Sequence, residues 1–195
     1  MIIDYLNRRE DEKFIPGKTW IRYAGRVFDK DEYLTLADAL LDGWITAGRY
    51  AEEFELKLSK YLGTKSSSLV NSGSSANLIA LTSLTSPTLG ADRLSKDDEV
   101  ITVAAGFPTT VNPIIQNNLV PVFLDIEEGT YNINPDLIEE SISEKTRAIM
   151  IAHTLGNPFD PDRVMKIAKD NNLFLIEDNC DGLGSEYGDK KTGTF

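Results

Sequence analysis

The hydrophobic and polar positions divide the chain into a helical beginning and a middle of alternating short apolar runs and helical patterns. Near the start, Asp29 and Glu32 have the spacing of a capping box, and apolar residues follow at helical intervals, which predicts a helix. A second helix is predicted from Tyr50 to Leu62. We interpret residues 1–28, with a solvated charge cluster at residues 8–13, as an N-terminal arm.

Short apolar runs without polar alternation predict strands in the middle of the chain, and they lie at residues 68–70, 100–103, 121–124, 148–151 and 173–176. Helical patterns separate these runs near residues 74–85, 109–117, 135–142 and 161–170. Buried strands separated by helices indicate an α/β fold with a mostly parallel sheet covered on both faces. Ligands bind such sheets at the carboxyl ends of the strands, so we expect the chemistry there.

The first strand-end motif, Asn-Ser-Gly-Ser-Ser-Ala-Asn at residues 71–77, leads into a predicted helix. Gly73 lets the backbone come close to a ligand, Ser74 and Ser75 offer hydroxyl groups, and the helix N-terminus favours a phosphate. The same pattern is also typical of an ordinary serine N-cap with a glycine turn. On its own, the motif leaves both interpretations open.

Two further strand ends carry residues that suit an aromatic cofactor. Asp178 follows a buried strand, where its carboxylate requires a partner such as a protonated pyridine nitrogen, a helix cap or a salt bridge. Phe107 follows another strand and offers a ring for offset stacking, although phenylalanine is more often a core residue. Together with the phosphate motif, these residues indicate a site for pyridoxal or pyridoxamine 5′-phosphate. His153, the only histidine, is expected to have a hydrogen-bonded structural role.

Composition and charge exclude some classes of partner and indicate a cellular compartment. The 195 residues carry 20 basic and 31 acidic side chains, and a net charge of −11 argues against nucleic-acid or anionic-membrane partners. We expect no signal peptide, and no apolar run approaches the roughly 20 residues of a membrane span. The single cysteine, Cys180, excludes an internal disulfide and is typical of a reducing compartment. We therefore expect a cytoplasmic protein.

Longer strings in the chain resemble a known family, the DegT-type sugar aminotransferases, which are vitamin B6 enzymes of fold type I. The resemblance runs from about Phe14 onward, and its motifs are residues 42–50, 53–55, 61–63, 71–77 and 176–178. Three further strings resemble the branch of CDP-4-keto-6-deoxyglucose 3-dehydratases, lyases that make 3,6-dideoxy sugars for lipopolysaccharide O-antigen, and they lie at residues 104–113, 152–160 and 177–181. The resemblance implies that residues 29–195 are the N-terminal part of the cofactor-binding large domain, and that a small C-terminal domain is absent.

The resemblance also implies roles for individual residues, which are Gly73, Ser74 and Ser75 at the cofactor phosphate, Phe107 on its ring and Asp178 at its ring nitrogen. Asp181 takes the place beside the ring hydroxyl, where an anionic side chain departs from the aminotransferases. Cys180 matches the first of the cysteines that hold a [2Fe–2S] cluster in this branch. Such a cluster normally needs four thiolates, so ligation by Cys180 is a hypothesis about a longer protein, and the alternative is a buried free thiol.

The implied reaction uses pyridoxamine phosphate to expel the C3 hydroxyl of CDP-4-keto-6-deoxyglucose, after which a flavin and iron–sulfur reductase supplies electrons. The residue that transfers the proton is a lysine in the aminotransferases and a histidine in the dehydratases, and we expect its position to lie beyond Phe195. We therefore assign no catalytic residue to this chain, expect it to be inactive alone, and expect a homodimer for the parent protein. The alternatives are a nucleotide-sugar aminotransferase of the same family and a non-catalytic fragment.

Overall fold

The computed structural model describes residues 2–8, 13–22, 25 and 27–195, so residues 9–12 of the predicted charge cluster lie outside the described residues. The chain forms two compact units, Met1–Phe54 and Glu55–Phe195. The predicted boundary after residue 28 falls inside the first unit and stays a prediction. Among the described residues, no helix combines the length and the apolar character that crossing a membrane requires.

The first unit contains α1 (Ile2–Asn7), α2 (Lys30–Leu41) and the start of α3 (Arg49–Leu62). The predicted capping box is confirmed, because the Asp31 amide donates to Asp29 Oδ1 at 2.8 Å and the Asp29 amide donates to Glu32 Oε2 at 2.7 Å. This exchange satisfies amides that the first turn of α2 would otherwise leave unpaired.

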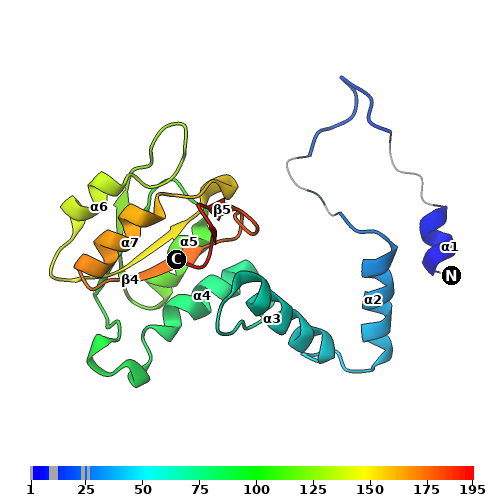
Figure 1. Cartoon of the computed structure of the whole chain (residues 1–195), viewed down its shortest axis with the longest axis horizontal. Helices are drawn as coiled ribbons and strands as arrows, with labels where there is room; N and C mark the ends of the chain where they lie inside the picture. The colour runs from blue at the N-terminus through cyan, green and yellow to red at the C-terminus, as the bar shows by residue number, and fades with distance from the viewer. Residues whose placement is uncertain (1, 9–12, 23–24, 26) are drawn as a thin grey trace. The chain divides into compact units, whose positions relative to one another are not determined.

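The second unit is built on four parallel strands in the order β2-β1-β3-β4, which confirms the predicted α/β fold. Figure 1 shows this sheet with helices packed around it. The strands are β1 (Glu99–Val103), β2 (Val120–Leu124), β3 (Thr146–Ala152) and β4 (Phe174–Asp178). The helices that cover them are α4 (Gly73–Ser83), α5 (Pro108–Gln116), α6 (Pro135–Ser141) and α7 (Pro161–Asp170). Shorter elements are two 3₁₀ helices, η1 (Pro87–Asp92) and η2 (Thr154–Gly156), and the antiparallel pair β5 (Glu186–Tyr187) and β6 (Lys190–Lys191).

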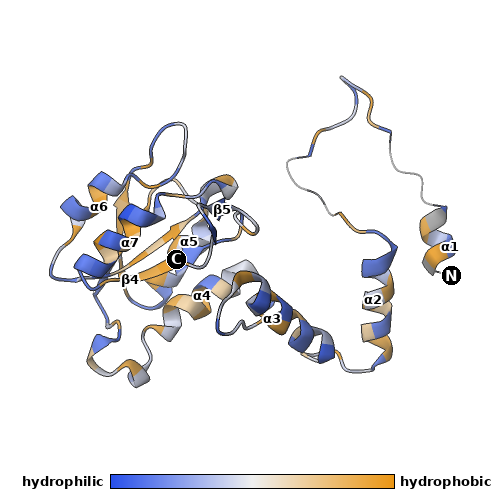
Figure 2. Ribbon diagram, viewed as in Figure 1, coloured by the Kyte–Doolittle hydropathy of each residue, from blue (hydrophilic) through white to orange (hydrophobic). Residues whose placement is uncertain are grey.

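Strand alternation divides the core into two apolar layers. Figure 2 shows the hydrophobic colouring of the central strands between the helices. On one face, Leu81 of α4 and Ile114 of α5 pack with Met150 of β3. On the other face, Ile138 of α6 and Val164 of α7 pack in the layer that includes alternate strand residues. Because side chains alternate along β4, Asp178 lies on the α4–α5 side with Phe174 and Ile176, whereas Glu177 lies on the α6–α7 side with Leu175.

The predicted strand at residues 68–70 is wrong, because this segment before α4 pairs with no strand in the part of the chain that the structure describes. The Leu69 amide donates instead to Glu55 Oε1 at 2.7 Å, and half of the Leu69 surface is exposed. A side-chain carboxylate from α3 thus takes the hydrogen bond that a neighbouring strand would accept. The other four predicted strands are confirmed.

Candidate functional site

The Asp178 carboxylate lies at the carboxyl end of β4 and is surrounded by hydrogen-bond donors. Its Oδ2 accepts from Asn77 Nδ2 at 2.7 Å and from Thr110 Oγ1 at 2.6 Å. Its Oδ1 accepts from the Cys180 amide at 3.2 Å. Asn77 lies in α4 and Thr110 lies in the first turn of α5, so this carboxylate joins the two helices on its face of the sheet to the strand.

The amide of Asn77 can be oriented from its neighbours. Its Nδ2 approaches two acceptors, Asp178 Oδ2 and the Thr109 carbonyl oxygen, the latter at 3.2 Å. Only the NH₂ end of an asparagine can donate to two acceptors at once. Asn77 is buried, and its side chain therefore acts as a fixed donor to the carboxylate.

The three donors to Asp178 are all neutral, although the residue is only 7% exposed. Among the described residues, no cation pairs with this carboxylate. A buried carboxylate that lacks a counterion is costly unless a ligand supplies the positive charge. The protonated ring nitrogen of a pyridoxal-type cofactor fits that requirement.

The predicted phosphate motif forms the N-terminus of α4. Ser72 is the N-cap and accepts from the Ser75 amide at 3.2 Å, and its hydroxyl also pairs with that of Ser75. Among the described residues, the amides of Gly73 and Ser74 have no acceptor, and both residues are exposed. The cap and the anion-binding interpretations are therefore compatible, because Ser72 provides the cap while the next two amides remain available.

This helix N-terminus lies close to the end of β4. A Cβ built on Gly73 would lie 3.9 Å from the Cys180 sulfur, and Asn77, one turn further along α4, bonds directly to Asp178. The structure thus brings together the phosphate motif and the carboxylate that the sequence predicted for one small ligand.

Phe107 is 71% exposed, so the interpretation of this ring as a core residue is wrong. Phe107 precedes α5, and its carbonyl oxygen accepts a hydrogen bond from the Thr110 amide at 3.0 Å. The Thr110 hydroxyl donates to Asp178. The first turn of α5 therefore links the exposed ring to the carboxylate.

Asp181 is exposed and follows the same strand end. Its Oδ2 accepts from the Leu155 amide at 3.3 Å. Leu155 has a φ of 57°, a left-handed conformation that is strained for a residue with a branched side chain. In this structure Asp181 stabilises a strained turn after β3, and its predicted contact with a ring hydroxyl stays a prediction.

Cys180 is exposed, so the alternative interpretation as a buried free thiol is wrong. Partial burial, followed by the negative charges of Asp178 and Asp181, raises the pKa of its thiol. Among the described residues, no group of three or more histidine, cysteine, aspartate or glutamate side chains is placed to hold a metal. A [2Fe–2S] cluster takes four thiolates and this chain carries one cysteine, so ligation by Cys180 within a longer protein stays a prediction.

Sequence reasoning missed the role of Glu177, which lies on the opposite face of β4 from Asp178. Its Oε2 accepts from His153 Nε2 at 2.9 Å and from the Gly193 amide at 2.8 Å, and its Oε1 accepts from the Phe195 amide at 2.8 Å. His153 is fully buried and stacks on Phe159 at 4.2 Å between ring centroids. The predicted hydrogen-bonded position of His153 is confirmed.

Asn77 and Thr110 were also missed, although Asn77 ends the quoted phosphate motif. Their signal in the sequence is weak, because a polar residue in the first turns of a helix usually faces solvent. Only the bonds to Asp178, across 101 and 68 residues of sequence, reveal their part in the site.

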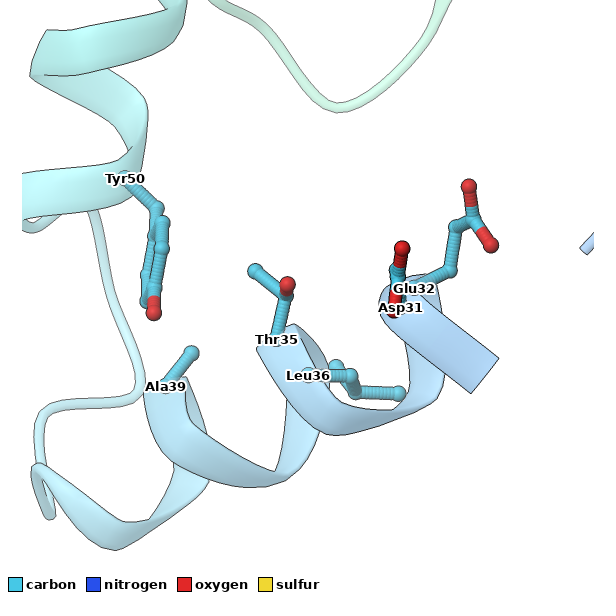
Figure 3. A pocket seen from close by; sticks show the side chains of 6 residues that line it. All are labelled: Asp31, Glu32, Thr35, Leu36, Ala39 and Tyr50. Carbon is cyan, nitrogen blue, oxygen red and sulfur yellow. The ribbon is translucent and has the colours of Figure 1, made fainter. Parts of the chain in front are cut away.

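A pocket of about 470 Å³ lies within the first unit, beside α2. Figure 3 shows Tyr50, from α3, pointing toward the same space as Thr35 and Ala39, from α2. The Tyr50 hydroxyl donates to Asp38 at 2.6 Å, and this bond together with Arg49 lowers the pKa of the Asp38 carboxyl. None of the residues predicted for the cofactor lines this pocket.

Comparison with known proteins shows which family the chain belongs to. The profile of the DegT/DnrJ/EryC1/StrS aminotransferase family matches residues 27–195. The chain is 55% identical over 192 residues, 98% of its length, to dTDP-4-dehydro-2,6-dideoxy-D-glucose 3-dehydratase of Saccharopolyspora spinosa, covering 42% of that protein. It is 50% identical over its whole length to the lipopolysaccharide biosynthesis protein RfbH of Salmonella typhimurium, covering 45% of that protein.

The fold also matches solved structures. One is the Escherichia coli GDP-4-keto-6-deoxy-D-mannose-3-dehydratase with bound hydrated PLP, which superposes with a TM-score of 0.82 at 34% identity. The match covers 88% of this chain and 44% of that one. The chain thus spans less than half the length of these relatives.

Proposed function

Because the chain belongs to the DegT/DnrJ/EryC1/StrS aminotransferase family, we propose that it is the cofactor-binding portion of a nucleotide-sugar 3-dehydratase that uses pyridoxamine 5′-phosphate. The observation that carries this proposal is Asp178, a buried carboxylate with neutral donors only among the described residues. The dehydratase activity, rather than transamination, is supported by the 55% identity to a protein named as a sugar 3-dehydratase.

The residues divide the work of holding the cofactor. Asp178 would keep the ring nitrogen protonated, and Phe107 would cover one face of the ring. The Gly73 and Ser74 amides, with the hydroxyl groups of Ser74 and Ser75, would bind the phosphate. When bound, pyridoxamine phosphate supplies an amine for the C4 ketone of the sugar and a ring that accepts electrons as the C3 hydroxyl leaves. The chain's own contribution is therefore to orient the ring and to hold positive charge on it.

We propose CDP-4-keto-6-deoxyglucose as the substrate, a reductase with flavin and iron–sulfur centres as the electron donor, and a cytoplasmic homodimer as the assembled state. The relative named for lipopolysaccharide biosynthesis supports a dideoxy-sugar product. Another relative is named for a dTDP-sugar, so assays with CDP- and dTDP-sugars test the nucleotide of this proposal. Ligation of a [2Fe–2S] cluster by Cys180 belongs to the same proposal for a longer protein, in which the other thiolates would have to come from outside this chain.

The name of the family favours a second function, that of a nucleotide-sugar aminotransferase. The residue at the lysine or histidine position of the parent protein discriminates between the two. Lysine there favours transamination, and histidine favours dehydration.

The cofactor proposal is tested by titrating the purified chain with pyridoxamine 5′-phosphate and following the fluorescence of the cofactor. We expect saturable binding that the Asp178→Asn variant loses. The same preparation, given CDP-4-keto-6-deoxyglucose and a reductase, should form no 3-deoxy product, and turnover by this chain would overturn the proposed inactivity of the isolated portion. Absence of binding would favour a non-catalytic relative instead.

A further inference from the structure

The two oxygens of the Asp178 carboxylate are not equivalent. Oδ2 accepts two short hydrogen bonds, from Asn77 at 2.7 Å and from Thr110 at 2.6 Å. A carboxylate oxygen has two lone pairs in the plane, so both acceptor positions of Oδ2 are filled. Oδ1 accepts one longer bond, from the Cys180 amide at 3.2 Å, which leaves it with one acceptor position.

From this asymmetry we infer that Oδ1 of Asp178 is the atom that receives the ring N–H of the cofactor, and that Asn77 and Thr110 are positioning residues that turn it there. The inference rests on the proposed function and extends it to two residues without a direct role in the chemistry. Neutral donors stabilise the negative charge of Asp178, but they bring no positive charge that would replace the cofactor's own.

The two donors also tie the carboxylate to the rest of the cofactor site. Asn77 lies one turn after Gly73 in α4, whose first amides would take the phosphate. Thr110 lies in the turn of α5 that follows Phe107, whose ring would cover the cofactor. A shift of either helix would therefore move one end of the cofactor site and the orientation of Asp178 together. This geometry sets phosphate, ring and ring nitrogen at mutually fixed positions before any ligand binds.

The chain offers a matched control for Thr110. Thr102 is also fully buried, but its hydroxyl has no partner among the described residues. Thr110→Val and Thr102→Val make the same chemical change, and only the first removes a donor from Asp178. Thr110→Ser keeps the hydroxyl and should rescue the site.

The experiment measures binding of pyridoxamine 5′-phosphate, ¹⁵N-labelled in the ring, to the 195-residue chain and its variants. We expect Thr110→Val to weaken binding by about tenfold, the loss of one hydrogen bond to a charged group, and to lower the protonated fraction of the ring nitrogen in the ¹⁵N spectrum. Thr110→Ser and Thr102→Val should both stay within about threefold of the parent chain. If Thr110→Val does not fold, Asn77→Ala removes the other donor and provides the same readout.

The outcomes separate the inference from the proposed function. If the parent chain does not bind the cofactor, or if Asp178→Asn binds equally well, the proposed function is wrong and the inference falls with it. If Asp178→Asn loses binding while the Thr110 and Thr102 valine variants behave alike, only the inference is wrong. A ring nitrogen that stays fully protonated in Thr110→Val, with unchanged affinity, also overturns the inference.

Discussion

Replacing Glu177 by glutamine is expected to break the hydrogen bond from the Phe195 amide and to keep the bond from the Gly193 amide. The carboxylate is 7% exposed and accepts three hydrogen bonds, two on Oε2 and one on Oε1. A glutamine has one acceptor oxygen. At the position of Oε2 this oxygen keeps two hydrogen bonds, from His153 and Gly193, so we expect the glutamine to adopt that orientation. The new NH₂ group then faces the Phe195 amide, donor against donor.

The magnitude follows from these contacts. A hydrogen bond to a charged group contributes about 1.5–3 kcal/mol, and a buried donor left without a partner costs about 1–3 kcal/mol. Because partial exposure of Phe195 lets water compensate in part, we expect the Glu177→Gln chain to lose about 2–4 kcal/mol of unfolding free energy. Alternation along β4 separates Glu177 from the cofactor face, so this loss concerns stability.

Two measurements check this expectation. Urea unfolding should be followed by far-UV circular dichroism, because both tryptophans, Trp20 and Trp44, lie in the first unit and do not report on the sheet. Amide hydrogen exchange should show fast exchange at Phe195 and retained protection at Gly193. Glu186→Gln is the control, since that exposed side chain pairs with Lys191 at 3.3 Å and should change stability by less than about 0.5 kcal/mol. Equal protection of both amides, with a stability change as small as in the control, would refute the reasoning.

Three further predictions concern a thiol, a glycine pair and a helix cap. Burial and the neighbouring carboxylates raise the pKa of the Cys180 thiol, so alkylation of this thiol should accelerate only at alkaline pH. The Asp181→Asn variant should be alkylated about twofold to threefold faster at pH 8. An unchanged rate in this variant would show that the charge of Asp181 does not raise the pKa. Gly156→Ala should lower the free energy of unfolding in urea by about 2 kcal/mol or more, since the new Cβ would lie 2.8 Å from the Asp181 carbonyl oxygen. Gly188 also has a positive φ but has open space around it, so Gly188→Ala should lower the free energy of unfolding by about 1 kcal/mol. Asp29→Ala should destabilise the first unit by about 1 kcal/mol, measured by tryptophan fluorescence; equal stability would discount the cap.

The secondary structure of the second unit was predictable because its signals are local. Buried parallel strands require unbroken apolar runs, and α5, α6 and α7 each begin with a proline in the first turn, where the missing amide is harmless. Residues 68–70, where a strand was predicted and none forms, have the same local apolar pattern as the other predicted strands. What it lacks is a neighbouring strand, and only the bond from Leu69 to Glu55 shows where its amide goes.

The candidate site was predictable only in part. Glycine, serine and aspartate at strand ends are visible in the sequence because ligand chemistry needs those residue types there. The residues that orient them are not visible in this way. Asn77 and Thr110 lie 101 and 68 residues from Asp178, and any short polar side chain in a first helical turn satisfies the local pattern equally well. Their role depends on how two helices dock on one strand, which sequence spacing does not encode.

The end of β4 explains why the order of its two carboxylates matters. Strand alternation sends Glu177 and Asp178 to opposite faces, and each is then surrounded by donors from different elements. Asp178 accepts hydrogen bonds from α4 and α5, the helices that carry the phosphate motif and follow the exposed ring. Glu177 accepts hydrogen bonds from His153, after β3, and from the backbone amides of Gly193 and Phe195. Among the described residues, each carboxylate accepts three hydrogen bonds, two on one oxygen and one on the other. What separates them is the face of the sheet: Glu177 pairs with the buried His153, whereas Asp178 has neutral donors and lies on the face of the phosphate motif, where it is placed to bind a cationic ligand.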